Sequence, residues 1–150
     1  MRIFITGGSG FIGSHLAPKL IARKHKLLFL KGDLKDIDVW KKELKKFRPD
    51  AVIHLAWEGL EQYDFTAAVS LRNMTNSLNI ISAAAELGCK KFLSVGSCWE
   101  YGDGEGALKE SAPLLLPAHV PDFVIAKRTI QAMGEQIALQ SNLQLLWGSL

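Results

Sequence analysis

Three glycines near the start of the chain form the pattern with the clearest chemical meaning. Gly7, Gly10 and Gly13 follow an apolar run at residues 3–5 and open a stretch in which apolar residues recur at helical spacing. Glycine at these positions allows a tight turn, a close approach of the backbone to a ligand, and close packing of a helix on a strand. Free N–H groups at the start of that helix would face an anion. The segment therefore predicts a pyrophosphate site, with an ordinary glycine-rich turn as the alternative.

The rest of the chain supplies elements that would position such a site. Apolar runs suited to buried parallel strands span residues 3–5, 27–30, 51–56, 92–95 and 143–147. Helical patterns lie between them, the longest over residues 64–87, where Gly88 would end the helix, and over residues 122–140. This alternation predicts an α/β fold with a doubly wound parallel sheet and helices on both faces. With 150 residues, 48% of them apolar, the chain is expected to form one domain over residues 1–150.

Ligands of such sheets bind beyond the carboxyl ends of the strands. The predicted strands would deliver four segments to that edge, at residues 6–8, 31–33, 56–58 and 96–98. We therefore expect the chemistry of the protein to gather there.

Composition argues against several classes of partner. The net charge is only +3, and the lysines are spread among acidic residues or lie on one face of an amphipathic helix, so no nucleic-acid partner is expected. Neither a signal peptide nor an apolar run of membrane-spanning length is present, and a cytoplasmic protein without a membrane partner is predicted. Cys89, Cys98 and the four histidines lack metal-ligand spacing, so no metal is expected. We expect Cys98 to be a small buried residue, because no histidine or acid is placed by sequence to activate it.

Several motifs occur together in one order: the glycine segment, residues 54–56 at a strand end, Asn73 in its helix, and residues 97–102. In this combination the chain resembles the extended short-chain dehydrogenase/reductase family, and within it the NAD-dependent sugar-nucleotide epimerases and dehydratases. The resemblance covers residues 1–147 and implies a Rossmann-like domain that binds NAD or NADP, a nucleotide sugar as substrate, and a homodimer. The cofactor-binding positions that it implies are Gly7, Gly8, Ser9, Gly10, Phe11, Ile12, Gly13, Lys31, Asp33, Leu34, Leu55, Ala56, Trp57, Asn73 and Lys127.

The resemblance also implies a catalytic set of a serine, a tyrosine and a lysine four residues after it. Ser97 and Lys127 match the serine and the lysine, but the tyrosine would fall at Phe123. A phenyl ring has no exchangeable proton for the acid/base step, so impaired chemistry is expected, with Lys127 keeping only a role at the ribose. Tyr101 is expected to pack, and sequence does not place the hydroxyl of Tyr63. A non-catalytic dinucleotide-binding module or a truncated relative is the alternative.

Two features leave the cofactor and the extent of the protein open. Relatives that are specific for NAD have an acid at the end of the second strand that binds the ribose. In register with the first strand, this position is occupied here by Lys31, which would suit a 2′-phosphate. Asp33, however, lies about 20 residues past Gly13, which is the spacing expected of that acid. NAD and NADP therefore both remain possible. Because the sequence stops just after its last predicted strand, the C-terminal substrate portion of the family is expected to be absent.

Overall fold

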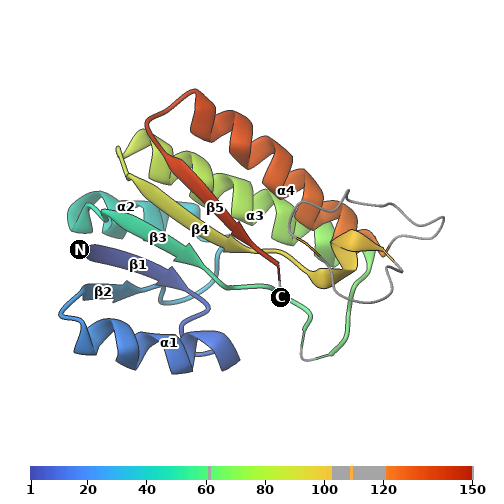
Figure 1. Ribbon diagram of the computed structural model, residues 1–150, viewed down its shortest axis with the longest axis horizontal. Helices are drawn as coiled ribbons and strands as arrows, with labels where there is room; N and C mark the ends of the chain where they lie inside the picture. The colour runs from blue at the N-terminus through green and yellow to red at the C-terminus, as the bar shows by residue number, and fades with distance from the viewer. Residues whose placement is uncertain (61, 103–108, 110–120, 150) are drawn as a thin grey trace.

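Five parallel strands form the centre of the protein. The computed structural model describes residues 1–60, 62–102, 109 and 121–149. Its strands are β1 (Arg2–Thr6), β2 (Lys26–Phe29), β3 (Ala51–His54), β4 (Lys91–Val95) and β5 (Gln144–Gly148). They pair in the order β2-β1-β3-β4-β5, and every pairing is parallel (Figure 1). The predicted α/β fold with a parallel sheet is confirmed.

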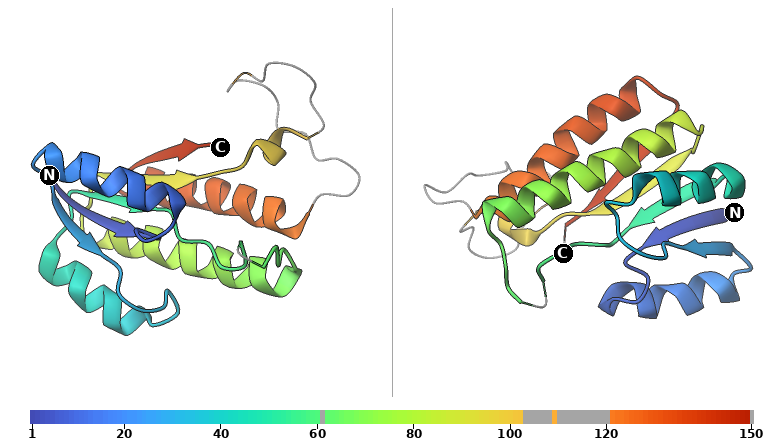
Figure 2. Two further views of the ribbon diagram at one scale, coloured as in Figure 1. Left: turned by 90° about the horizontal axis from the view of Figure 1, so that it is seen from below. Right: turned by 180° about the vertical axis from the view of Figure 1, so that it is seen from behind.

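Helices cover both faces of this sheet, as the doubly wound fold requires. They are α1 (Phe11–Ala22), α2 (Ile37–Phe47), α3 (Ala67–Glu86) and α4 (Asp122–Leu139), with a short 3-10 helix, η1 (Cys98–Tyr101), after β4. The views in Figure 2 place α1 on one face of the sheet and α2, α3 and α4 on the other. None of the helices in the described part of the chain is long and apolar enough to cross a membrane.

Side chains of β1 point alternately to the two faces of the sheet and so contribute to both layers of the core. Neighbouring side chains of a strand point to opposite faces. Phe4 therefore packs in the larger core cluster with residues of α2, α3 and α4, whereas Ile3 and Ile5 pack on the side of α1 with Leu20. Burial on both faces explains why this strand is an uninterrupted apolar run.

Helix α2 forms where apolar residues recur three and four positions apart. Its Trp40 and Leu44 are buried, while the side chains of Lys42 and Lys45 are exposed to solvent. The indole Nε1 of Trp40 also donates a hydrogen bond to the carbonyl oxygen of Leu34 over 2.8 Å. The helix thereby fixes the loop that follows β2, which borders the site.

The boundaries differ from the expected ones where side chains redirect the backbone. Helix α3 begins at Ala67 rather than at residue 64, because the Asp64 carboxylate accepts hydrogen bonds from the amide and hydroxyl of Thr66 and forms a turn there. Its end is as expected, since Gly88 has a φ of +72°. Strand β3 stops at His54, and the Ala56 amide donates to the hydroxyl oxygen of Thr6.

Candidate functional site

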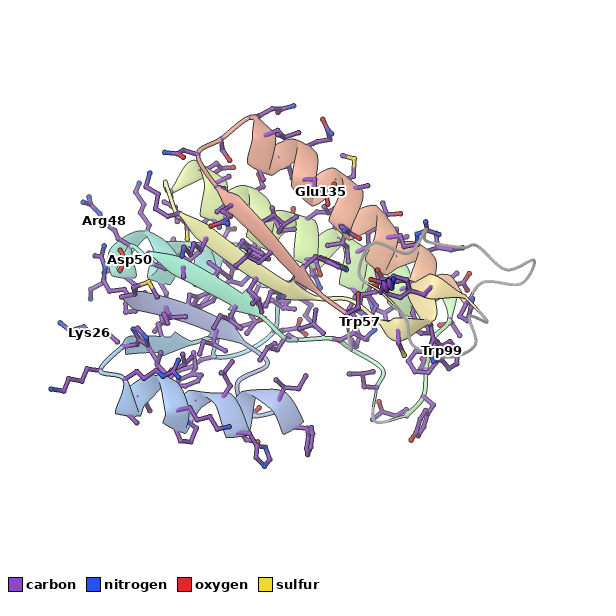
Figure 3. The ribbon with its side chains drawn as sticks, viewed as in Figure 1. Lys26, Arg48, Asp50, Trp57, Trp99 and Glu135 are labelled. Carbon is purple, nitrogen blue, oxygen red and sulfur yellow. The ribbon has the colours of Figure 1, made fainter. Side chains whose placement is uncertain are left out.

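The strand order reverses between β1 and β3, and a crevice is expected at such a switch point, beyond the carboxyl ends of the strands. A cavity of about 1290 Å³ lies there. It is lined by residues 7–13, Phe29, Leu30, Gly32, Asp33, Leu34, residues 55–60, Gln62 and Asn73. A narrower cavity of about 210 Å³ shares Trp57 and several neighbours with it and is also lined by Ser97, Phe123 and Lys127. Figure 3 shows Trp57 and Trp99 at this end of the molecule, with Lys26, Arg48 and Asp50 at the opposite end.

The glycine segment joins β1 to α1 in a conformation that side chains would prevent. Gly7 has a φ of +68°, and a Cβ there would lie 2.6 Å from the Ala56 amide nitrogen. A Cβ on Gly13 would collide with the carbonyl oxygen of Gly7. Gly10 differs, because a Cβ there would meet only that same oxygen, at 3.3 Å, and Gly10 lines the large cavity. Gly7 and Gly13 are therefore required by packing, whereas Gly10 keeps the cavity free.

The first turn of α1 faces this cavity without a partner of its own. Among the described residues no side chain caps the helix, and its first turn contains no acid. Phe11 and Ile12 belong to this turn and line the cavity. Unpaired N–H groups and the helix dipole make such an end suitable for an anion.

Asp33 lines the large cavity, and Lys31 does not. One carboxylate oxygen of Asp33 accepts a hydrogen bond from the Lys35 amide over 3.0 Å, and the other lies 3.2 Å from the Lys35 ammonium. These contacts, the backbone hydrogen bond above all, lower the pKa of Asp33. The acid at this edge is therefore ionised at neutral pH. Phe29, which sequence reasoning did not select, places its ring against Gly8.

A buried histidine connects the ends of β1 and β3 to α3. The ring nitrogens of His54 lie 2.6 Å from the Thr6 hydroxyl and 2.8 Å from the Ser77 hydroxyl. Since Ser77 donates its proton to the Asn73 carbonyl, it accepts from Nε2–H, and Nδ1 accepts from Thr6. The Thr6 oxygen in turn accepts from the Ala56 amide. Burial lowers the pKa of His54 to about 3, so the imidazole is neutral.

Asn73, expected at the cofactor, holds the wall of the cavity. Its amide oxygen accepts from the Glu58 amide over 2.8 Å, and its amide nitrogen donates to the carbonyls of Glu58 and Val69. The Glu58 carboxylate also pairs with Arg72 over 2.6 Å. Asn73 lines the cavity as well, but two of these hydrogen bonds hold the loop after β3 at Glu58 and the third lies within α3.

Lys127 projects from α4 into the narrower cavity. Its ammonium donates to the carbonyl oxygen of Val95 over 2.6 Å and lies 3.9 Å from the ring centroid of Trp57, a cation–π contact. Burial lowers the pKa of Lys127 to about 8, although the charge of Glu100 opposes this shift. The amine is therefore mainly charged at neutral pH.

Ser97 and its surroundings contain a residue that sequence reasoning missed. The Ser97 hydroxyl accepts from the Trp99 amide, while the Ser97 amide donates to the fully buried carboxylate of Glu100 over 2.7 Å. An acid three residues after a serine is a capping-box signal and indicates such a contact. The expectation that Cys98 is buried is wrong: η1 turns Glu100 inward and leaves Cys98 exposed.

Phe123 occupies the first turn of α4 and is almost completely buried. Its ring lies 4.7 Å from that of Phe65 and 5.5 Å from that of Trp99. The structure thus brings Ser97, Phe123 and Lys127 to one cavity. Tyr101 is half-buried and Tyr63 is 82% exposed, and neither is among the residues that line the two cavities. Within the described residues no group of histidines, cysteines and acids is arranged to hold a metal ion.

Comparison with known proteins identifies one family and relatives of related activity. The model of the NAD dependent epimerase/dehydratase family matches residues 3–150. A UDP-glucose 4-epimerase of Klebsiella pneumoniae is 29% identical over 132 residues, which cover 69% of this chain and 94% of that sequence. A dTDP-6-deoxy-L-talose 4-dehydrogenase (NAD(+)) of Aggregatibacter actinomycetemcomitans is 26% identical, with 98% of this chain and 59% of that protein covered.

Among solved structures, a GDP-L-fucose synthetase from Naegleria fowleri bound to NADP has a TM-score of 0.82 at 26% identity, with 99% of this chain and 49% of that chain covered. The present chain spans about half the length of the solved structures that it matches.

The burial of neutral His54 predicts a pH-dependent stability. The folded pKa of about 3 lies below the ordinary value of 6.5 for histidine, so the stability that neutral His54 contributes is complete above pH 6.5 and is lost as the pH falls toward 3. The expected loss is about 1.4 kcal/mol per pH unit in the free energy of unfolding. Urea unfolding at pH 7 and pH 5 should show a weaker pH dependence in His54→Asn than in the wild type. His15→Asn, at an exposed ring, should retain the full dependence. Equal slopes for His54→Asn and the wild type would contradict the assignment.

Proposed function

The chain belongs to the NAD-dependent epimerase/dehydratase family, and from this premise we propose that it is the NAD(P)-binding domain of a protein that acts on a nucleotide sugar. The observation that carries the proposal is the large cavity at the switch point, with an uncapped helix end on one side and free space above Gly10. The narrower cavity with Ser97 and Lys127 adjoins it through shared residues.

In this proposal the pyrophosphate lies over residues 7–13, where backbone N–H groups and the dipole of α1 favour an anion. Lys127, whose ammonium reaches the narrower cavity, binds the ribose hydroxyls next to the nicotinamide. The bound cofactor supplies hydride transfer. The protein supplies the position and charge of Lys127, the hydroxyl of Ser97 and the apolar walls formed by Trp57 and Phe123.

NAD is the cofactor that the charges favour. Asp33 is an ionised acid on the cavity wall, and Glu58 lines the same cavity; the Arg72 hydrogen bond lowers the pKa of Glu58, while the charge of Asp33 acts on it in the opposite direction. A carboxylate at this edge suits a ribose 2′-hydroxyl and repels a 2′-phosphate. Lys31, which would suit that phosphate, is exposed and lies outside the lining.

The chemistry of the domain is impaired in our proposal, because the residue at position 123 has no hydroxyl. The ring of Phe123 fills an aromatic cluster with Phe65 and Trp99 instead of presenting a polar atom. This same packing favours the second candidate function, a module that binds the dinucleotide without turnover.

Helices α3 and α4 lie side by side in both ribbon views (Figures 1 and 2), and each leaves large apolar side chains exposed. Leu71 of α3 is 57% exposed, and Ile125 and Met133 of α4 are 49% and 50% exposed. We propose that this pair of helices forms the interface of a homodimer.

Gly10→Val should abolish binding of NAD in isothermal calorimetry, because the added methyl groups would occupy the space that the phosphates need. The fold should persist, since a Cβ at Gly10 meets only one neighbouring atom. Gly148→Val is the matched control, because nothing lies within 4 Å of a Cβ there. It should bind NAD as the wild type does. Wild-type affinity in Gly10→Val would exclude this placement of the pyrophosphate.

Removing each charge at the ribose edge in turn should show which of the two side chains decides the preference between NAD and NADP. Asp33→Asn is expected to weaken the binding of NAD by roughly 1 to 3 kcal/mol, which is the scale of a hydrogen bond to a charged group. The difference between the affinities for NAD and NADP should therefore become smaller. Lys31→Ala should change neither affinity. A selective loss of NADP binding in Lys31→Ala would instead place the 2′-phosphate at Lys31.

Phe123→Tyr should restore a proton donor and acceptor at the cavity shared with Ser97 and Lys127. General acid/base groups contribute about 10²- to 10⁴-fold, so reduction of NAD in the presence of UDP-glucose, followed at 340 nm, should rise by a comparable factor. Phe65→Tyr adds the same hydroxyl to the neighbouring ring and should have no such effect. Rapid turnover by the wild type that survives Ser97→Ala would show that other residues carry the chemistry.

The proposed interface predicts a dimer by light scattering at micromolar concentration. Ile125→Glu should shift the protein to a monomer, because a buried unpaired carboxylate is unfavourable. Val39→Glu on α2, at a similarly exposed valine, should leave the dimer intact. A monomeric wild type would contradict the proposal.

A further inference from the structure

Glu100 is a completely buried acid next to the candidate catalytic residues. Its relative exposure is 0%, and it stands in the short helix η1 directly after β4. A carboxylate in such a place is unfavourable unless hydrogen bonds and an opposite charge compensate for its desolvation. Both kinds of compensation are present, and each involves a residue of the narrower cavity.

The hydrogen bonds use both carboxylate oxygens. Oε1 accepts from the Ser97 amide over 2.7 Å, and Oε2 accepts from the indole Nε1–H of Trp147 on β5 over 3.2 Å. Two N–H donors on two oxygens are the pattern that an ionised carboxylate accepts. Gly96 permits this arrangement, because a Cβ there would lie 2.6 Å from Oε1 and would collide with the indole nitrogen.

The opposite charge is that of Lys127. Its ammonium donates to the Val95 carbonyl, so Lys127 and Glu100 hold the same short segment, one by the carbonyl of Val95 and the other by the amide of Ser97. The negative charge of Glu100 raises the pKa of Lys127 against the effect of burial. Among the described residues, His54 of β3 is a second titratable group in electrostatic contact with Lys127, and its ring is neutral.

We propose that Glu100 is a positioning residue of this site, which fixes the backbone of Ser97, is oriented by Trp147, and acts as the counter-charge of the Lys127 ammonium. The inference rests on the proposed roles of Ser97 and Lys127, but its geometry is independent of any cofactor. A purely structural capping residue would need only an acceptor for the Ser97 amide. Glu100→Gln therefore separates the two roles, because glutamine keeps the shape and one acceptor oxygen while it removes the charge.

The test measures the protonation of Lys127 in the protein without cofactor. The rate of acetylation of Lys127 by acetic anhydride is followed from pH 6 to pH 11 by peptide mass spectrometry, with the exposed Lys19 as internal reference. The wild-type midpoint is expected near 8. Glu100→Gln should move the midpoint down by about one unit or more, the scale of a lost opposite charge nearby. Trp147→Phe removes the indole donor but keeps the charge, so its midpoint should stay close to that of the wild type.

An unchanged midpoint in folded Glu100→Gln would overturn the proposal. A second measurement needs no variant: hydrogen exchange of the wild type should show slow exchange of the Ser97 amide and of the Trp147 indole N–H. Rapid exchange of both would also overturn the proposal. Failure of the wild type to bind NAD would contradict the proposed function and leave the acetylation result unaffected, so the two failures are distinguishable.

Discussion

The shape of the site depends on the buried imidazole of His54. Its two nitrogens join Thr6, the last residue of β1, to Ser77 in the middle of α3. Thr6 is followed at once by Gly7, and the Thr6 oxygen also holds the amide of Ala56, whose backbone packs against Gly7. The turn that opens the glycine segment and the wall that faces it are therefore fixed by one neutral ring. Protonation would leave Nδ1 without an acceptor lone pair, which explains why neutrality is required.

Charged groups are distributed around the site according to how much water reaches them. Asp33 and Glu58 lie at the open rim, where each is paired with an exposed cation, Lys35 or Arg72. Such exposed pairs contribute little to stability, and their effect is on the field at the cavity mouth. Glu100, by contrast, is fully buried away from solvent, and it accepts two N–H hydrogen bonds at its oxygens. Carboxylates at the rim therefore contribute to the electrostatic field there, whereas the buried carboxylate of Glu100 positions the backbone of Ser97.

Local sequence patterns predicted much of this architecture because they depend on residues close in the chain. The stripe of α2, the stop at Gly88 and the apolar strands were all identifiable in this way, and the structure confirms them. The requirement for glycine at positions 7 and 13 was also predictable, since strand, turn and helix are contiguous.

Contacts across long separations were not predictable. Trp147 lies 47 residues from Glu100, and the partner of Thr6 is 48 residues away. Sequence reasoning left Lys31 and Asp33 as alternatives at the ribose edge. Strand β2 ends at Phe29, and in the loop that follows, Asp33 lines the cavity whereas Lys31 does not. The contact of Glu100 with the Ser97 amide follows a local capping-box pattern, but the contact of Glu100 with Trp147 depends on how η1 meets β5.

In the proposed function, binding of the dinucleotide and proton transfer depend on different parts of the site. The anion cradle consists of backbone N–H groups and missing side chains, so it persists as long as β1 and α1 pack closely. The proposed loss of proton transfer instead rests on position 123, where the ring of Phe123 packs in a cluster of aromatic rings. A phenyl ring in that cluster has no polar atom to desolvate, so it fits the aromatic packing without offering an exchangeable proton. Under the proposed function, the chain retains its cavity, its charged Lys127 and its Ser97 while the acid/base group is absent.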